Sequence, residues 1–363
     1  MIVLNVRNPQ RALPAALKLI RQRGIERDSR NGKVLVVPEP VTTVYSQPRE
    51  RVIFHEWRDA NPFFHFYESL WMLAGRRDVA PLAKFAKRME TFSDDGKTFN
   101  AAYGYRWRHA GFGSPGRLID GEGPVVFDRD QLNDIVALLR KNPDDRQCVL
   151  QIWDHERDLG TQTKDHACNL MATFQIADDA LNMVVFCRSN DIVWGCYGAN
   201  VVHFSMLLEY VAGRVGVNVG TYTQISVNWH GYLDTVEPIL EHQSADDHGD
   251  DVYDPYEMGD VYPYPIADTT IDEKWDEDVR KFVTNDGRAP HETFHNRFFN
   301  EVAMPLVVAH DLFKDGLILE AIDHANRIAA DDWRLACKAW LRRRLERQIR
   351  RQKAEDDGVH PDA

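Results

Sequence analysis

Hydrophobic positions along the chain form two kinds of run, one typical of buried helices and one typical of strands. Residues 63–75 follow Asn61–Pro62, are apolar on every side and end in a glycine, so they predict a deeply buried helix. Residues 200–213 predict a second apolar helix, which ends at Gly213. Short β-rich runs predict strands at 148–153, 170–176, 181–187 and 221–229, with a turn at 177–180.

The pattern changes after Tyr232. Residues 244–260 are rich in aspartate, including Asp246, Asp247, Asp250, Asp251 and Asp254, and predict a solvated loop. Residues 301–353 have a helical pattern that ends in Arg342-Arg343-Arg344 and Arg350-Arg351. We interpret these arginines as a solvated helix face, and a patch that binds phosphate or a partner is the alternative.

Composition narrows the class of protein. The 363 residues carry 44 Lys+Arg and 56 Asp+Glu, a net charge of −12, which argues against a nucleic-acid partner. No apolar run approaches the ~20 residues that span a bilayer, and the N-terminus has no signal-peptide core. Five cysteines without a CxxC pair favour a reducing compartment and no zinc site. We therefore expect a cytoplasmic enzyme without a metal or a membrane partner.

One cysteine is a candidate nucleophile. Cys168 stands at the start of a predicted strand after a polar loop, where catalytic groups are common. The alternative is a small buried hydrophobe, because a reactive thiol needs a lowered pKa. Glu68, inside the first apolar helix, is suited to proton transfer if it is not simply paired with a basic residue.

Polar residues gather where the strand at 181–187 ends. Arg188-Ser189-Asn190-Asp191 is followed by Trp194-Gly195 and then by Asn200 at the start of the second helix. Arginine and serine suit a phosphate, and an asparagine amide suits the edge of a planar heterocycle. A further polar cluster, 228–232, ends the next strand. The sequence therefore predicts a site for an anionic, hydrogen-bonding ligand.

Between about Arg27 and Asp234 the chain resembles the thymidylate synthase family. The matching elements, in family order, are Arg30, Glu68, Tyr103-Gly104-Tyr105-Arg106-Trp107, Arg146, Cys168, Arg188-Ser189-x-Asp191, Gly195, Asn200 and His230-x-Tyr232. The resemblance implies transfer of one carbon from 5,10-methylenetetrahydrofolate to C5 of a pyrimidine nucleoside monophosphate. It also implies an α/β fold with a mixed twisted sheet around a buried central helix, and a homodimer packed sheet to sheet.

The resemblance also implies a role for each matched residue. The catalytic residues would be Cys168, which adds to C6 of the ring, with Glu68, Asn200 and Tyr103. The nucleotide would be held by Arg30, Arg146, Arg188, Ser189, Asn169, Asn200, His230 and Tyr232. Arg146 would be donated across the dimer interface to the phosphate. The folate would contact Asp191, Trp194, Gly195 and Met89.

Departures from the family pattern bear on the product. Met89 and Phe92 stand where two tryptophans normally precede the Tyr-Gly motif, and the family's closing C-terminal segment has no counterpart in 358–363. After one-carbon transfer, the exocyclic methylene on C5 takes either hydride, which gives methyl, or water, which gives hydroxymethyl. Loss of the indole shelf and of the closing tail favours water. This resembles the nucleotide hydroxymethylase branch, known from phages with modified DNA, so the compartment would be the host cytoplasm if a phage encodes the chain.

The base is harder to assign. Asn200 serves uracil or cytosine, because its amide can flip, and cytosine-reading relatives often carry aspartate there. Asn169 in place of the family's histidine, and one extra residue within 196–199, change the C4 side of the base and favour cytosine slightly. Our first hypothesis is therefore a deoxycytidylate (dCMP) 5-hydroxymethyltransferase. A dUMP hydroxymethylase and a divergent thymidylate synthase that releases dihydrofolate are the alternatives.

Two other classes of protein stay open. A non-catalytic nucleotide-binding protein is disfavoured because Cys168, Glu68 and the arginines occur together. A Cys–His hydrolase would pair Cys168 with His166 or His230. We divide the chain into a thymidylate synthase-like catalytic core at 1–240, an acidic insertion at 241–300 and a C-terminal helical extension with a basic tail at 301–363, the last within the same domain.

Overall fold

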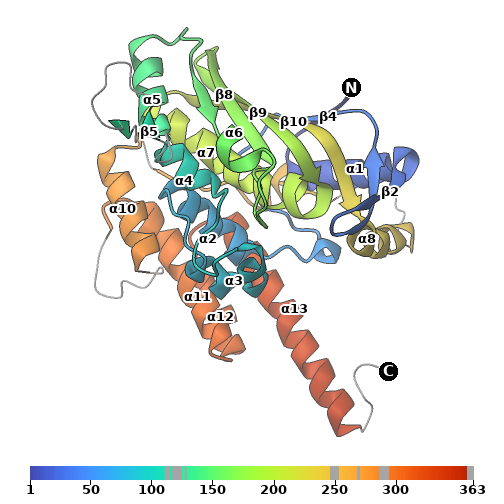
Figure 1. Cartoon of the computed structure of the whole chain (residues 1–363). Coiled ribbons are helices and arrows are strands. Elements are labelled where there is room, and N and C mark those ends of the chain that lie inside the picture. The colour runs from blue at the N-terminus through green and yellow to red at the C-terminus, as the bar shows by residue number, and fades with distance from the viewer. Residues whose placement is uncertain are drawn as a thin grey trace.

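A mixed sheet of eight strands, all described within residues 2–232, runs through the molecule (Figure 1). The strand order is β1-β4-β10-β9-β8-β7, and β3 lies beside β10 with β2 at its outer edge. The strands are β1 (Ile2–Val6), β2 (Ile25–Ser29), β3 (Gly32–Val37), β4 (Val41–Tyr45), β7 (Val149–Gln151), β8 (Asn169–Ala177), β9 (Ala180–Asp191) and β10 (Asn218–Tyr232). Pairs β1–β4 and β9–β10 are parallel and the others antiparallel, which confirms the predicted α/β class with a mixed sheet.

The computed structural model describes residues 1–110, 115–116, 125–126, 129–245, 253–267, 270–285 and 294–357. Strands β5 (Pro115–Gly116) and β6 (Val125–Val126) form a separate antiparallel pair. Four of the aspartates of the predicted acidic loop (Asp246, Asp247, Asp250 and Asp251) and the tail 358–363 lie outside these residues.

Strand β10 organises the sheet because it serves three neighbours. Its first half pairs with β4, from Tyr222 opposite Tyr45, and its last four residues pair with β3. Its other edge pairs with β9 along almost its whole length. The predicted turn at 177–180 is confirmed: Asp178 and Asp179 have φ of 50° and 58°, which suits a tight hairpin between β8 and β9.

Helices cover the sheet and extend away from it (Figure 1). They are α1 (Pro9–Arg23), α2 (Pro62–Leu73), α3 (Ala80–Phe85), α4 (Tyr103–Arg108), α5 (Gln131–Lys141), α6 (His155–Asp158), α7 (Asn200–Val215), α8 (Leu233–Ala245), α9 (Pro255–Met258), α10 (Glu273–Thr284), α11 (Met304–Lys314), α12 (Ile318–His324) and α13 (Asp331–Asp356). Shorter turns are η1 (Glu56–Arg58), η2 (Lys87–Phe92), η3 (Ile192–Ala199), η4 (Phe299–Ala303) and η5 (Ala325–Arg327). No helix in the described part of the chain is long and apolar enough to cross a membrane.

The two apolar helices of the sequence are the centre of the fold. Every residue of α2 is buried; Asn61 caps its first turn by accepting from the Phe64 N–H at 3.2 Å, and Gly75 follows its end with φ +73°. Helix α7 packs against α2 and against β9 and β10. The prediction that this helix ends at Gly213 is wrong, because it continues to Val215 and ends at Gly216, whose φ is +91°.

The aspartate-rich segment is not wholly a solvated loop. Asp254 is completely buried, accepts from Asn8 Nδ2 at 2.8 Å and caps α9 by accepting from the Tyr256 N–H at 3.1 Å. Aspartate composition indicates solvation only when the carboxylates lack partners in the fold, and this partner is 246 positions away in the sequence. Within 241–300, residues 273–284 form the regular helix α10, which packs on α2.

The C-terminal helices predicted at 301–353 are confirmed as η4, α11, α12, η5 and α13. Helices α11 and α13 pack on α2, and the end of α13 projects away from the body (Figure 1). The basic face of α13 is only partly solvated, because Arg343, Arg344 and Arg347 all pair with Asp59. The division of the chain at residues 240 and 300 stays a prediction.

Candidate active site

A cavity of about 440 Å³ opens where α2, η2, the segment before β8, the end of β9 and the start of α7 meet. Ten residues singled out in the sequence line it: Glu68, Met89, Tyr103, Cys168, Ser189, Asp191, Trp194, Gly195, Asn200 and Tyr232. Segments more than 150 positions apart in the sequence therefore supply one site. Five predicted residues are not part of this lining: Arg30, Arg146, Asn169, Arg188 and His230.

Cys168 is half-buried and its backbone is held on both sides. Its N–H donates to the Tyr103 hydroxyl at 3.3 Å, and its carbonyl accepts from the Arg188 N–H at 2.9 Å. Burial raises the pKa of the Cys168 thiol, and the positive charges of Arg188 and Arg30 partly offset this. The thiol is therefore protonated at neutral pH in this state, so its proton must leave before it attacks a ligand.

The thiol has no histidine partner in the described part of the chain. Sγ donates to the backbone carbonyl of His166 at 3.8 Å, while the His230 ring contacts the Asn228 carbonyl at 3.4 Å. Neither imidazole lines the cavity. A nucleophile activated by an adjacent histidine needs the two groups within hydrogen-bond reach, so the geometry does not favour the Cys–His hydrolase.

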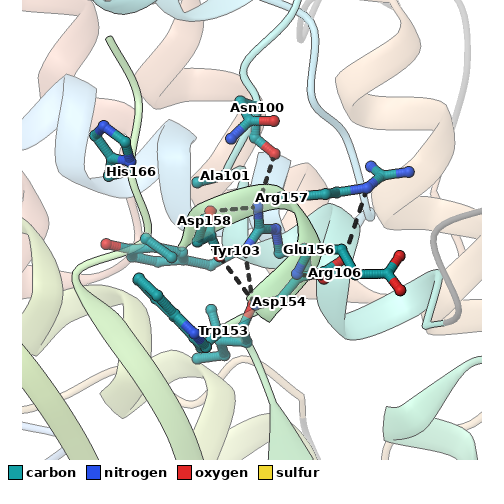
Figure 2. Close-up of polar contacts among 12 residues, drawn as sticks. Asn100, Ala101, Tyr103, Arg106, Trp153, Asp154, Glu156, Arg157, Asp158 and His166 are labelled. Atoms are coloured by element: carbon teal, nitrogen blue, oxygen red, sulfur yellow. Dashed lines mark hydrogen bonds and ion pairs between the residues drawn. The ribbon is translucent and has the colours of Figure 1, made fainter. Parts of the chain in front are cut away.

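A buried ion pair supports the segment that carries Cys168 (Figure 2). The Arg106 guanidinium on α4 donates to both carboxylate oxygens of Asp158 on α6, at 2.5 and 3.0 Å, and both side chains are at most 1% exposed. Arg106 also donates to the carbonyls of Ile152 and Asn100. The adjacent residue, Ala101, donates its N–H to Asp165 at 2.7 Å, three positions before Cys168.

We expect Asp158→Asn to lower the free energy of unfolding by about 3–5 kcal/mol, because it leaves a buried guanidinium without its counter-charge. Urea denaturation followed by circular dichroism measures this loss. The double variant Arg106→Met/Asp158→Leu removes both charges and should be less destabilised than the single variant. An unchanged free energy of unfolding in Asp158→Asn would show that the Arg106–Asp158 ion pair does not stabilise the fold.

A buried histidine that the sequence reasoning missed faces the predicted acid–base residue. His203 on α7 places Nε2 3.0 Å from Oε2 of Glu68 on α2, and both side chains are buried. His203 lines the cavity together with Glu68 and Cys168. The available signal was its spacing, because His203 lies three positions after Asn200 and so shares a face of the helix with it.

The amide of Asn200 is held by a second asparagine. Asn200 Nδ2 donates to Oδ1 of Asn190 at 3.2 Å, and Asn190 Nδ2 donates to Ser226 Oγ at 3.0 Å. Gly195 leaves room for this contact, since a Cβ there would lie 2.9 Å from Asn190 Oδ1 and 3.1 Å from Asn200 Nδ2. Asn200 therefore presents a fixed edge to the cavity.

The segment before Asn200 is the irregular helical turn η3, whose backbone is kinked at Tyr197 and Gly198. Asp191 caps this turn by accepting from the N–H groups of Val193 and Trp194 at 2.7 and 2.6 Å. Gly198 allows the kink, because a Cβ there would lie 2.6 Å from the Val193 carbonyl oxygen.

One side of the cavity fits a flat heteroaromatic ring. Trp194 is 49% exposed, with the Arg58 and Arg88 guanidinium groups 5.3 and 5.6 Å from its ring, and Phe92 is 38% exposed. Asp191 Oδ2 is buried without a hydrogen-bond partner, and burial raises the pKa of this carboxyl. An exposed indole beside an unpaired carboxyl oxygen can stack a ring and accept from its N–H groups.

The five predicted residues outside the lining differ in their exposure and in their contacts. Arg30 lies exposed at the β2–β3 turn, whose next residue, Asn31, lines the cavity, and Arg188 donates to the Ala167 carbonyl at 2.8 Å. His230 is buried with its ring 5.5 Å from that of Tyr232. The other two differ: Asn169 is fully buried with neither amide atom bonded, and Arg146 is exposed before the edge strand β7.

A family model described as thymidylate synthase matches residues 15–249, about two thirds of the chain. The chain belongs to the thymidylate synthase family. It is therefore a one-carbon transferase that acts at C5 of a pyrimidine with a folate donor, as the family's chemistry requires. The resemblance inferred from Cys168, Glu68 and Asn200 is confirmed, and the cavity brings these three residues together.

Curated relatives of this thymidylate synthase family member include phage enzymes. A deoxyuridylate hydroxymethyltransferase of Pseudomonas phage M6 is 46% identical over 99% of both chains. A deoxyuridylate hydroxymethyltransferase of Bacillus phage SP01 is 41% identical over 56% of this chain and 52% of its own. A thymidylate synthase of Equine herpesvirus 2 is 29% identical over 47% of this chain and 55% of its own.

Proposed function

We propose that the chain is a deoxyuridylate hydroxymethyltransferase, which converts dUMP and methylenetetrahydrofolate to 5-hydroxymethyl-dUMP. The likeness to the Pseudomonas phage M6 enzyme carries this proposal, because it extends over 99% of both chains. It therefore includes the C-terminal helices α10 to α13, which lie beyond the family match at residue 249. This proposal reverses the order in which the sequence ranks the two bases, since the relatives so named act on deoxyuridylate rather than dCMP.

The fixed amide of Asn200 supports a site that reads a single base. Uracil offers an N3–H donor and an O4 acceptor, whereas cytosine offers an N3 acceptor and an amino donor. An amide free to flip serves both bases, but flipping Asn200 alone breaks its bond to Asn190 Oδ1, so the other orientation requires Asn190, which is bonded to Ser226, to flip as well. Gly195 of η3 lies against both asparagines, since a Cβ there would lie 2.9 Å from Asn190 Oδ1 and 3.1 Å from Asn200 Nδ2.

The chain's own residues account for the steps at the nucleotide. Cys168 would add to C6 of uracil and make C5 nucleophilic, and Glu68 would move protons at the ring. Arg30, Arg188 and Ser189 would hold the phosphate, and His230 with Tyr232 the ribose. Bound methylenetetrahydrofolate supplies the one-carbon unit. Trp194 and Asp191 would hold its ring, with Gly195 and Met89 beside it.

The product proposal depends on access of water to C5. The lining at η2 includes Met89 and Phe92 at the positions of the family's two tryptophans, and Phe92 is 38% exposed. These smaller side chains shield the reacting methylene less than an indole shelf would, which favours water over hydride.

We also propose a homodimer, with the helix-free face of the sheet as its interface. Met183 and Val185 of β9 are buried under the helices, whereas the alternating residues Val184 and Phe186 are only half-buried, and Val227 of β10 is 57% exposed. An apolar sheet face of this kind is typical of obligate interfaces. Arg146, exposed at the sheet edge, would then reach the phosphate in the partner's cavity. The phage relatives favour the host cytoplasm as the compartment.

A product assay tests the function. Purified protein is incubated with methylenetetrahydrofolate and dUMP, dCMP or CMP, and the nucleotide is analysed by mass spectrometry while dihydrofolate absorbance is followed. We expect 5-hydroxymethyl-dUMP without dihydrofolate. Hydroxymethylated dCMP would correct the base, methylated dUMP with matching dihydrofolate would indicate a thymidylate synthase, and no product would favour a binding protein.

A further inference from the structure

His203 and Glu68 meet inside the cavity without completing a hydrogen bond. Nε2 of His203 lies 3.0 Å from Oε2 of Glu68, yet neither atom, nor Nδ1 of His203, has a properly directed partner. The side chains of His203 and Glu68 are only 3% and 8% exposed. A buried pair at hydrogen-bond distance but with poor alignment keeps unused donor and acceptor capacity, which a third polar molecule in the cavity can satisfy.

The position of His203 relates this pair to the base. It follows Asn200 by one helical turn on α7, so the two side chains lie on the same face and both line the cavity with Cys168. His65, one turn before Glu68 on α2, does not line the cavity. Burial, and then the nearby charges of Arg58 and His203, hold the pKa of His65 well below its usual value, so it stays neutral.

We propose that His203, which lies beside Glu68, accepts the proton of the water molecule that adds to the exocyclic methylene on C5 of the nucleotide. This inference rests on the hydroxymethyl product proposed above, and it names the residue that makes water the acceptor. Nothing in the nucleophile or in the phosphate-binding arginines distinguishes water from hydride, whereas a base beside the reacting carbon favours water.

The proposed step balances without a further reactant. The water oxygen forms a bond to the methylene carbon, and the electron pair of the exocyclic double bond moves into the ring as an enolate across C5, C4 and O4. The water proton goes to His203, and the carboxylate of Glu68, 3.0 Å away, stabilises the imidazolium. The enolate then reforms the C5–C6 double bond as the bond from C6 to Cys168 Sγ breaks and the thiolate leaves.

The test separates water addition from the steps before it. With [5-³H]dUMP, release of tritium reports loss of the C5 proton, which precedes water addition, and mass spectrometry reports the nucleotide product. Added 2-mercaptoethanol traps any exocyclic methylene that water does not reach, as a thioether. For His203→Gln we expect water addition to fall by about 100-fold, the typical contribution of a general base, while tritium release persists and the thioether becomes the main product.

His310→Gln is the matched control, because His310 is equally buried, at 2% exposed, but lies outside the cavity. It should release tritium and form hydroxymethyl product as wild type does. A parallel fall of tritium release and product in His203→Gln, or an unchanged product, would overturn the inference. A wild-type enzyme that forms no hydroxymethyl nucleotide would contradict the proposed function itself, and the wild-type arm shows this independently.

A second variant keeps the test decisive if His203→Gln folds poorly. His203→Ala leaves a space the size of an imidazole ring beside Glu68, and added imidazole should restore the hydroxymethyl product at the expense of the thioether. A histidine that only fills space would not respond in this way. Added imidazole can shift the product from the thioether back to the hydroxymethyl nucleotide only by acting as a base. Absence of rescue in a folded His203→Ala protein that still releases tritium would contradict the proposal.

Discussion

Replacing Cys168 with alanine should reduce formation of any C5-modified nucleotide by at least about 10⁴-fold, the order of loss expected when a covalent nucleophile is removed. The reason is chemical: C5 of uracil attacks an electrophile only after a thiolate has added to C6. Release of tritium from [5-³H]dUMP should also stop, since C5 loses its proton only within the adduct. Mass spectrometry of the nucleotide and counting of released tritium measure both losses.

Binding should survive this change. Cys168 is held by backbone bonds to Tyr103 and Arg188, which alanine retains, so the fold and the affinity for dUMP should be close to those of wild type. Cys148→Ala is the matched control, because Cys148 is a buried free cysteine outside the cavity, and it should keep its activity. Turnover by Cys168→Ala would mean that another group attacks C6 and that the covalent mechanism is wrong.

Asn200→Asp should have the second largest effect and should change which base is accepted. The carboxylate loses the amide donor for O4 of uracil and repels that oxygen, so kcat/KM for dUMP should fall by about 100-fold, while the amino group of cytosine gains an acceptor. The aspartate keeps the size of asparagine, and Asn190 can turn its amide N–H toward the new carboxylate, so the protein should still fold. Steady-state kinetics with dUMP and dCMP measure the change.

Asn190→Ala is the informative comparison for this variant. It leaves the Asn200 amide in place but removes the oxygen that orients it. The ratio of kcat/KM for dUMP to kcat/KM for dCMP should therefore fall, while kcat/KM for dUMP falls less than in Asn200→Asp. If Asn200→Asp keeps the wild-type preference for dUMP, the base is read by another group in the cavity.

Local pattern predicted the most apolar elements. Helix α2 is buried throughout, and strands β7, β8, β9 and β10 have buried residues among more exposed ones; all five lie where the apolar and β-rich runs placed them. The ends were less well predicted: Gly213 lies inside α7, where it leaves room for Ile271, and the helix ends at Gly216, which has the positive φ. Asp254 was predicted to be solvated because its partner, Asn8, is distant in the sequence.

The residues of the candidate site were also predicted only in part. Cys168, Glu68 and Asn200 could be found from motif order, and the cavity joins them. His203 was missed because its neighbours in the sequence, Val202 and Phe204, are apolar, and Asn190 was noted within a polar cluster but given no role; each becomes meaningful only through a contact, with Glu68 and with Asn200. Side-chain pairs made across two helices, or between a strand and a helix, are set by tertiary packing, which a single sequence does not encode locally.

The three-sided pairing of β10 constrains how the chain can assemble as it is synthesised. Strands β1 to β4 are complete at Tyr45, but the strand that joins them to the rest of the sheet begins only at Asn218. Until β10 leaves the ribosome, the N-terminal strands present open edges, and β9 lacks its parallel neighbour. Sheets built from such distant segments form slowly and expose edges that aggregate. A chaperone that covers these edges during synthesis should therefore raise the yield of folded protein.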